Sequence, residues 1–170
     1  MEQAHLSTLT VRDAGAADAA AIAAIYQPYV LETAISFEEQ AVGREAMAGR
    51  IAEAQAAGLP WLAACRDGVL VGYAYASKWR LRPAYRHAVE TSVYVARDAH
   101  GRGAGRALYT ALLARLRADG KHLAIAGIAL PNEPSIALHE SFGFEKAAHF
   151  KEVGFKFGAW RDVAYWQLLL

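Results

Sequence analysis

The residues best suited to chemistry lie in a short glycine-rich segment between a β-like run and a helical pattern. This segment contains Gly101, Arg102, Gly103, Gly105 and Arg106. Glycines allow the backbone to bend sharply and to approach a ligand, and the first N–H groups of a helix point outward at its positive end. We therefore predict a loop whose amides bind a phosphate or pyrophosphate, the alternative being a turn that only joins strand to helix.

The segment does not match two common phosphate-binding loops. A Rossmann loop would have a glycine where this chain has Arg106, and a P-loop would need a Gly-Lys-Ser/Thr sequence that the chain lacks. The class of ligand must therefore be inferred from the sequence on either side of the loop.

A second candidate is Glu90, which lies in the apolar run Val89–Val95 just before the loop. In an alternating strand, Glu90 and Ser92 point to one side of the sheet, whereas Val89 and Thr91 point to the other. A carboxylate among such apolar neighbours either faces water or is kept for proton transfer.

Hydrophobic periodicity predicts one α/β domain, residues 1–170 with a core at about 9–169, in which a mixed, twisted sheet flanked by helices positions these residues. We expect strands at 9–13, 61–66, 69–76, 89–96 and 122–130, two more in the tail 144–170, and helices at 16–31, 44–57, 103–118 and 132–142. Asp67-Gly68 predicts a type I′ turn, and Pro28 predicts a disturbance in the first helix.

Composition and charge exclude several classes of protein. The 170 residues include 18 Lys+Arg and 17 Asp+Glu, and the net charge of +1 argues against a dedicated nucleic-acid binder. Cys65 is the single cysteine, so neither an intramolecular disulfide nor a cysteine-built zinc site is expected. Met1–His5 lacks the features of a signal peptide, and no apolar run reaches the ~18–20 residues of a membrane helix. We expect a metal-free cytoplasmic protein without nucleic-acid or membrane partners.

The glycine-rich loop resembles motif A of the Gcn5-related N-acetyltransferases (GNAT), Gln/Arg-x-x-Gly-x-Gly/Ala, with His100 where Gln or Arg is usual. Further segments resemble the phosphinothricin and methionine sulfoximine acetyltransferases of that superfamily, so the similarity covers about residues 9–169. They are Val89–Val95, Pro131–His139, Gly143-Phe144 and Val153–Trp160. The resemblance implies the GNAT fold and acetyl-CoA as co-substrate.

The resemblance also implies which residues hold acetyl-CoA. Loop amides would bind its pyrophosphate, and the strand edge after Glu90 and the helix that begins near Asn132 would bind the pantetheine arm. The residues expected at acetyl-CoA are Val93, Tyr94, Val95, Gly101, Arg102, Gly103, Ala104, Gly105, Arg106, Asn132 and Ser135. Taken by itself, Asn132 is a good helix N-cap, and the two roles are compatible.

For catalysis, the resemblance implies that Glu90 is the general base and that the amine attacks directly in a ternary complex. His139 stands where many relatives carry a tyrosine that protonates the departing thiolate, and a merely packed histidine is the alternative. The residues expected at the acceptor are Phe37, Arg80, Leu81, Arg82, Glu90, Thr91 and Ser92. Arg80 or Arg82 can clamp a carboxylate or phosphinate, unless the two belong only to a solvated loop.

We therefore expect acetyl transfer to the α-amine of a small amino-acid-like substrate such as phosphinothricin, methionine sulfoximine or methionine sulfone. One alternative is another acceptor amine: a protein N-terminus, a polyamine or an aminoglycoside. Another is an acyl-CoA-binding module without turnover, which regulates a partner. The resemblance of the segment Phe155–Trp160 to a dimer-contact region in relatives implies a homodimer.

Overall fold

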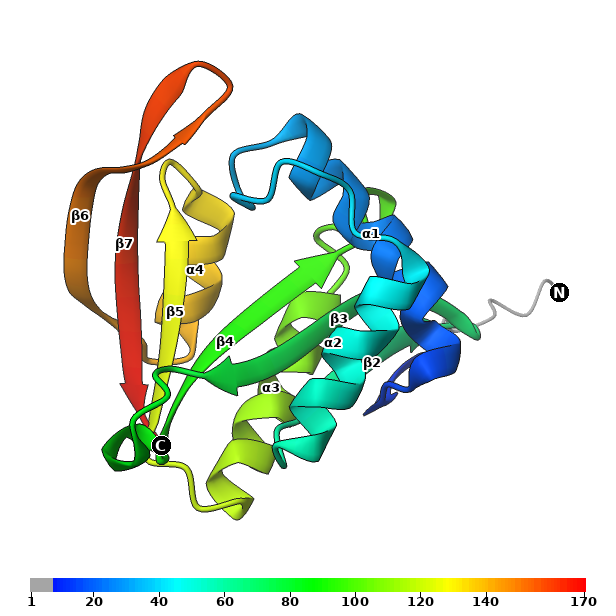
Figure 1. Cartoon of the computed structure of the whole chain (residues 1–170). Helices are drawn as coiled ribbons and strands as arrows, with labels where there is room; N and C mark the ends of the chain where they lie inside the picture. Colours follow the sequence, from blue (N-terminus) through cyan, green and yellow to red (C-terminus); the bar gives the residue numbers. More distant parts are fainter. Residues whose placement is uncertain (1–7) are drawn as a thin grey trace, which may run out of the picture.

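The computed structural model describes residues 8–170, and a seven-stranded sheet with the order β1-β2-β3-β4-β5-β7-β6 runs through it (Figure 1). The strands are β1 (Leu9–Asp13), β2 (Trp61–Arg66), β3 (Val69–Lys78), β4 (Ala88–Val95), β5 (Leu123–Ala129), β6 (Glu145–Lys156) and β7 (Ala159–Leu169). The helices are α1 (Ala19–Glu32), α2 (Arg44–Ala56), α3 (Ala104–Ala118) and α4 (Glu133–Ser141). Only β4 and β5 are parallel neighbours among these strands, so the sheet is mixed, as predicted.

The predicted elements are present, with boundaries shifted by a few residues. The first helix differs most, because a 3-10 turn at Ala16–Asp18 precedes α1, which then continues through Pro28 to Glu32. Buried side chains on both sides of Pro28 keep α1 packed on the sheet, and this packing offsets the lost backbone hydrogen bond. Between β2 and β3, Asp67 (φ 50°) and Gly68 (φ 83°) have the positive φ angles of a type I′ turn.

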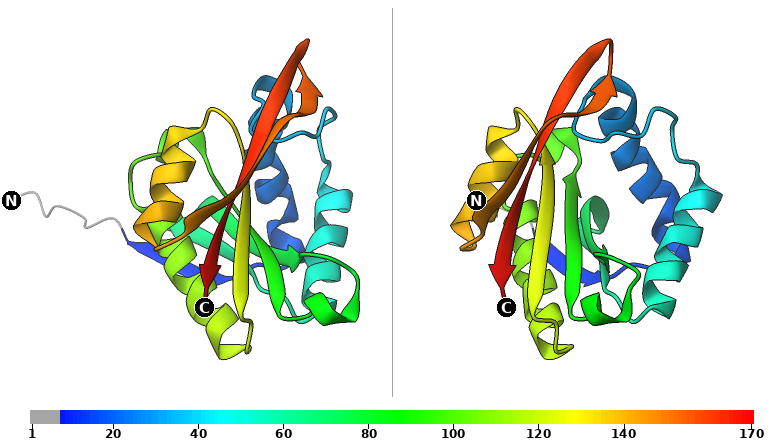
Figure 2. Two further views of the ribbon diagram at one scale, coloured as in Figure 1. Left: turned by 90° about the vertical axis from the view of Figure 1, so that its left-hand side faces the viewer. Right: turned by 60° about the vertical axis from the view of Figure 1, so that its left-hand side comes forward.

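The helices form two layers, with α1 and α2 on one face of the sheet and α3 and α4 on the other (Figure 2). Strand β3 shows how alternation serves both layers. Tyr73 packs in the cluster with α1 and α2, whereas Ala74 and Ala76 pack in the cluster with α3. Small alanines on that side let α3 lie close to the sheet, where Leu108 and Leu112 are fully buried.

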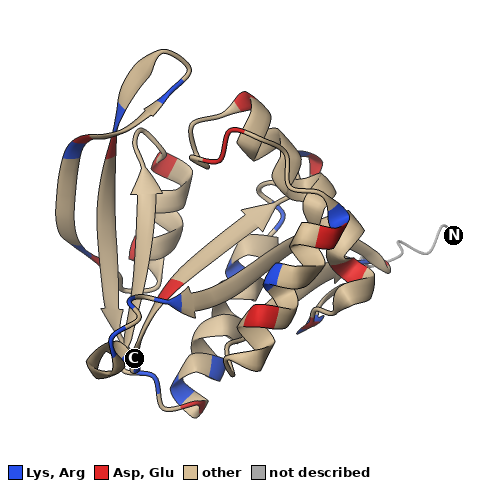
Figure 3. Cartoon of the chain, in the orientation of Figure 1, with Lys and Arg blue, Asp and Glu red and all other residues tan. Residues whose placement is uncertain are grey.

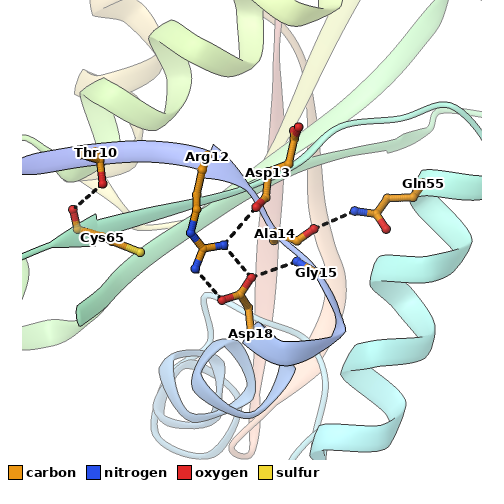
Figure 4. A network of polar contacts seen from close by, with 8 residues as sticks. All are labelled: Thr10, Arg12, Asp13, Ala14, Gly15, Asp18, Gln55 and Cys65. Carbon is orange, nitrogen blue, oxygen red and sulfur yellow. Dashed lines mark hydrogen bonds and ion pairs between the residues drawn. The ribbon is translucent and has the colours of Figure 1, made fainter. Parts of the chain in front are cut away.

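The start of α1 is fixed by a polar network at the end of β1 (Figure 4). The Arg12 guanidinium donates to both carboxylate oxygens of Asp18, at 2.7 and 2.8 Å, and holds the pKa of that carboxyl below its usual range. Asp18 also accepts the Gly15 N–H, and Gln55 of α2 donates to the Ala14 carbonyl at 2.7 Å. These contacts set the direction of α1, which carries two tyrosines into the site described below.

Strands β4 and β5 diverge after a short parallel contact. Their pairing runs from Ala88 opposite Leu123 to Glu90 opposite Ile125, although β4 continues to Val95 and β5 to Ala129. The divergence is visible in Figure 1 as a V that opens towards the loop before α3. It frees one edge of β4 immediately after Glu90.

The sequence predicted no disulfide, membrane helix, metal site or signal peptide. Cys65 is buried and unpaired. Across residues 8–170, no helix is long and apolar enough to span a membrane, and no group of His, Cys, Asp and Glu side chains is arranged to hold a metal ion. The segment interpreted as lacking a signal peptide lies outside the described residues.

Candidate active site

A long cleft of about 830 Å³ fills the V between β4 and β5 and continues under the start of α3. Its walls come from β4, the loop before α3, β5 and α4. All the residues predicted to hold acetyl-CoA line this cleft, except Arg102. The carbonyl of Arg102 is instead held from outside, because Arg66 of β2 donates to it at 2.6 Å.

The glycine loop has the conformation expected of an anion cradle. Gly101 (φ 71°) and Gly103 (φ 84°) are both left-handed, a conformation that glycine adopts at little cost. The helical hydrogen-bond ladder of α3 begins with the Ala107 N–H, which donates to the Gly103 carbonyl at 3.0 Å. The N–H groups of residues 104–106 therefore point out of the positive end of α3 towards the cleft.

His100 fastens this loop to the end of β4. Its Nε2 lies 2.8 Å from the Tyr29 hydroxyl and 3.0 Å from the Val95 carbonyl, and the Tyr29 hydroxyl donates to the same carbonyl at 2.5 Å. Because a carbonyl can only accept, these contacts require a proton on Nε2. The sequence analysis missed Tyr29, whose helical spacing is indistinguishable from that of a core residue.

The start of α4 forms a further wall of the long cleft. The Asn132 side chain accepts the Ser135 N–H at 3.3 Å, so the predicted N-cap is confirmed. Both residues line the cleft. The cap uses Oδ1 of Asn132 and leaves its Nδ2 group unused by the cap.

A buried chain of hydrogen bonds holds His139. Its Nδ1 lies 2.7 Å from the Ser135 carbonyl and must donate, so the neutral ring accepts from the Tyr109 hydroxyl at Nε2, 2.6 Å away. Burial lowers the pKa of His139 and favours this neutral form. Thr91 continues the chain, with its hydroxyl 3.1 Å from that of Tyr109. The sequence analysis placed Thr91 at the acceptor, but its side chain is directed to α3.

A side pocket of about 590 Å³ adjoins the long cleft. The two cavities share the residues Ile35, Ser92, Tyr94, Gly127 and Ala129. The rest of the side pocket is mainly aromatic and aliphatic, with contributions from α1, the connection between α1 and α2, β4, β6 and β7. These residues are Tyr26, Ser36, Phe37, Glu38, Glu90, Phe150, Val153, Val163 and Tyr165.

Glu90 stands at the edge of the side pocket, as its place in the alternation predicts. It is the single charged residue of β4, and β5 has none (Figure 3). Burial raises the pKa of this carboxyl, and the positive charge of Arg80 partly opposes the rise. A Cβ atom on Gly127 would lie 3.2 Å from Oε1 of Glu90, so the glycine leaves room beside the carboxylate.

The second carboxylate of the side pocket differs from the first. Glu38 is ion-paired with Arg50 of α2, and the hydrogen bond from Arg50 lowers the pKa of Glu38. Glu38 is therefore held in its ionised form. Of the two carboxylates, Glu90 has the pKa better suited to accepting a proton near neutral pH.

The remaining predicted acceptor residues fall into two groups. Phe37 and Ser92 line the side pocket, and Arg80 lies beside it, stacked 4.2 Å over the ring of Trp79, which contacts Tyr165 edge-on. Leu81, which is 89% exposed, and Arg82 lie on the solvent-facing loop between β3 and β4. The structure does not bring these last two into either cavity.

The geometry fits acetyl-CoA. Outward-facing amides at a helix start suit a pyrophosphate, and the long cleft leads from them along the free edge of β4 to the side pocket. A model of the acetyltransferase (GNAT) domain matches residues 11–165 of the chain. No alternative phosphate-binding family is needed to explain the glycine loop.

The sequence is also similar to those of individual acyltransferases and acetyltransferases. The chain is 43% identical to the L-amino acid N-acyltransferase MnaT of Escherichia coli K12, over 95% of this chain and 94% of that protein. It is 45% identical to a phosphinothricin N-acetyltransferase of Alcaligenes faecalis, over 93% and 81%, respectively.

Solved structures extend the similarity to three dimensions. A phosphinothricin acetyltransferase from Sinorhizobium meliloti in complex with acetyl-CoA superposes with a TM-score of 0.92 at 41% identity, covering 96% of this chain and 89% of that one. The yncA protein of Salmonella typhimurium, solved with its cofactor acetyl-CoA, gives 0.92 at 40% identity, covering 95% and 94%. The chain therefore belongs to the GNAT acetyltransferases and uses acetyl-CoA as its acetyl donor.

Proposed function

We propose that the enzyme acetylates the α-amine of a small amino-acid-like substrate, with phosphinothricin, methionine sulfoximine and methionine sulfone as the best candidates. The observation that carries this proposal is the junction of the two cavities at Ser92, Tyr94 and Gly127, with Glu90 beside it. An acetyl donor in the long cleft and an amine in the side pocket would meet there. Relatives about 40–45% identical are named for these same acceptors.

Acetyl-CoA would be held mainly by backbone groups. The amides of residues 101–106 would bind its pyrophosphate, and Arg106 adds positive charge at the same helix end. The free edge of β4 at Val93–Val95, together with Asn132 and Ser135, would hold the pantetheine arm.

The acceptor would be oriented by its two ends. Arg80 would pair with its carboxylate or phosphinate, from a position beside Trp79 and close to Glu90. Phe37 would pack on its side chain, in a pocket whose walls are mostly aromatic and aliphatic. An arginine at position 80 favours a small acceptor with an anionic group over a polyamine or an aminoglycoside, which are polycations.

Proton transfer would start at Glu90. Most of the α-amine is protonated at pH 7, so Glu90 accepts a proton from it, directly or through water. The neutral amine then attacks the thioester carbonyl. A C–N bond forms, the C–S bond breaks and the thiolate leaves, and the nitrogen loses its second proton to solvent. A backbone N–H near Val93 or Tyr94 would stabilise the oxyanion. Both ring nitrogens of His139 already form hydrogen bonds, so His139 would orient Tyr109 and would not act as the acid. Solvent would protonate the thiolate.

The test is a measurement of thiol release from acetyl-CoA against a panel of amines. We expect rapid release with methionine sulfoximine, methionine sulfone and phosphinothricin, and slow release with free polar amino acids, spermidine and kanamycin. Fast turnover of spermidine or kanamycin instead would move the acceptor to that class. Silence across the panel, with acetyl-CoA still bound, would favour a macromolecular acceptor or a binding module.

Two further parts of the proposal concern the whole protein. A homodimer is supported by the resemblance of the segment Phe155–Trp160 to a dimer contact and by the exposed aromatic residues there, such as Phe157 and Trp160. A cytoplasmic location rests on the sequence features given above. Both remain predictions.

A further inference from the structure

One buried cation is not used by the proposed chemistry. Lys156, near the tip of the β6–β7 hairpin, is only 3% exposed. Its Nζ donates to the carbonyls of Val30, Ser36 and Glu38, at 2.6, 2.6 and 2.7 Å. An ammonium group has three N–H donors, and each of them finds one carbonyl here.

The three acceptors belong to a segment more than a hundred residues away in the sequence. The Val30 carbonyl is one of the last four of α1, which lack partners within the helix, and a cation there also faces the negative helix end. Ser36 and Glu38 lie in the connection between α1 and α2. Lys156 therefore joins the hairpin tip to this connection, and the two segments lie side by side in Figures 1 and 2.

A second contact also joins the hairpin tip to the connection between α1 and α2. A Cβ atom on Gly154 would lie 2.2 Å from the Phe37 ring, so the ring occupies the space that a side chain at 154 would fill. Phe37 lines the side pocket from the α1–α2 connection, and Val153 lines it from β6. The wall of the side pocket is thus built from two distant segments, with Lys156 and Gly154 at their junction.

We propose that Lys156 is a positioning residue for the acceptor: it holds the connection at residues 33–42 against the hairpin and so sets the wall of the side pocket. The inference rests on the proposed function, in which the side pocket binds the acceptor. Lys156 lines neither cavity, and the long cleft takes only Ile35 from this connection. Loss of the Lys156 ammonium should therefore weaken binding of the acceptor and leave binding of acetyl-CoA unchanged.

The experiment compares Lys156→Met with wild type and with Lys151→Met, a matched change at an exposed lysine of the same strand. We expect Lys156→Met to raise the acceptor KM by about tenfold or more while the acetyl-CoA dissociation constant stays within about twofold. The acceptor KM of Lys156→Arg should fall between those of wild type and Lys156→Met. A guanidinium keeps N–H donors, but its planar geometry cannot direct them at all three carbonyls. Lys151→Met should match wild type. An unchanged acceptor KM in folded Lys156→Met would overturn the proposal.

A second variant and a second measurement cover the other outcomes. If Lys156→Met does not fold, Gly154→Ala becomes the deciding variant, because it displaces Phe37 without a left-handed backbone: a raised acceptor KM supports the junction, and an unchanged one contradicts it. Hydrogen exchange of residues 33–42 should be faster in Lys156→Met than in Lys151→Met. If wild type acetylates none of the panel, the proposed function fails, and this exchange comparison alone decides whether Lys156 holds the connection.

Discussion

Glu90 combines partial burial with access to a cavity, and these are the two properties that a general base needs. Burial raises its pKa towards the working range, and Arg80 limits that rise and so keeps the carboxylate form available. The side chain of the next residue, Thr91, points to the other face of the sheet, where its hydroxyl forms a hydrogen bond with that of Tyr109. One strand thus supplies the proposed base and a structural group at consecutive positions.

Replacing Glu90 with Gln should lower kcat by about 100-fold or more and leave acetyl-CoA affinity nearly unchanged. A base at this position must be ionised to accept a proton, so we expect wild-type activity to rise with pH through the raised pKa of Glu90. The variant should lose this acidic limb of the kcat/KM profile. Steady-state kinetics across pH provide the measurement, and an unimpaired variant would remove Glu90 from the role of base.

Thermal unfolding is the control for this substitution. A carboxyl whose pKa is raised in the folded state binds its proton more tightly there than in the unfolded chain, so its ionisation above the unfolded pKa of about 4.3 opposes folding. Gln removes that term. The Tm of Glu90→Gln at neutral pH should equal or exceed that of wild type, which separates lost chemistry from lost folding.

Residue types revealed part of the site and concealed the rest. Glu90 and the loop glycines are unusual in their local patterns, and the family resemblance added Ser92. Tyr29 and Tyr109 sit at helical spacing among apolar residues, and their hydroxyl contacts depend on strands that periodicity does not place. Lys156 has partners more than a hundred residues away, and no local pattern encodes them.

At the scale of elements, the turn between β4 and α3 depends on left-handed backbone at Gly103. We expect Gly103→Val to cost about 1–2 kcal/mol of stability, since a Cβ atom is strained there. It should also weaken acetyl-CoA binding by about tenfold, because the loop amides shift. Calorimetric titration with CoA and thermal unfolding measure the two effects.

Gly58 supplies the matched control for this loop. It has a similar φ of 68°, open space around its Cβ position and a place at the end of α2, away from the long cleft. Gly58→Val should lose comparable stability and keep the wild-type affinity for CoA. Equal losses of affinity in both variants would show that strain, and not loop geometry, weakens binding.

The elements themselves followed from periodicity, but their divergence did not. Alternation in β4 and the apolar run of β5 predict two strands, and neither pattern states where their pairing ends. The pairing stops after Glu90 and Ile125, and the long cleft depends on that stop. Helix α1 continues through Pro28, as its predicted range required, because tertiary packing outweighs the local penalty of the proline.

At the scale of the whole molecule, the hairpin tip presents an apolar surface to solvent. Val153, Phe155, Phe157 and Trp160 are each more than half exposed. Contiguous exposed apolar residues of this kind mark interaction surfaces. We expect light scattering to give twice the chain mass of 18.4 kDa and Trp160→Glu to shift the protein towards the monomer. A wild-type monomer at micromolar concentration would contradict the homodimer.

The short pairing between β4 and β5 has a consequence for what this strand tolerates during evolution. Glu90 lies at the last position of β4 that pairs with both neighbouring strands, so the proposed base is held by the sheet just before one edge of the strand becomes free. Substitutions that keep the alternation preserve this arrangement. A single inserted or deleted residue between Ala88 and Glu90 would exchange the faces, turning the carboxylate into the core against α3 and the Thr91 hydroxyl into the side pocket. Length changes should therefore be confined to the exposed loop before Ala88.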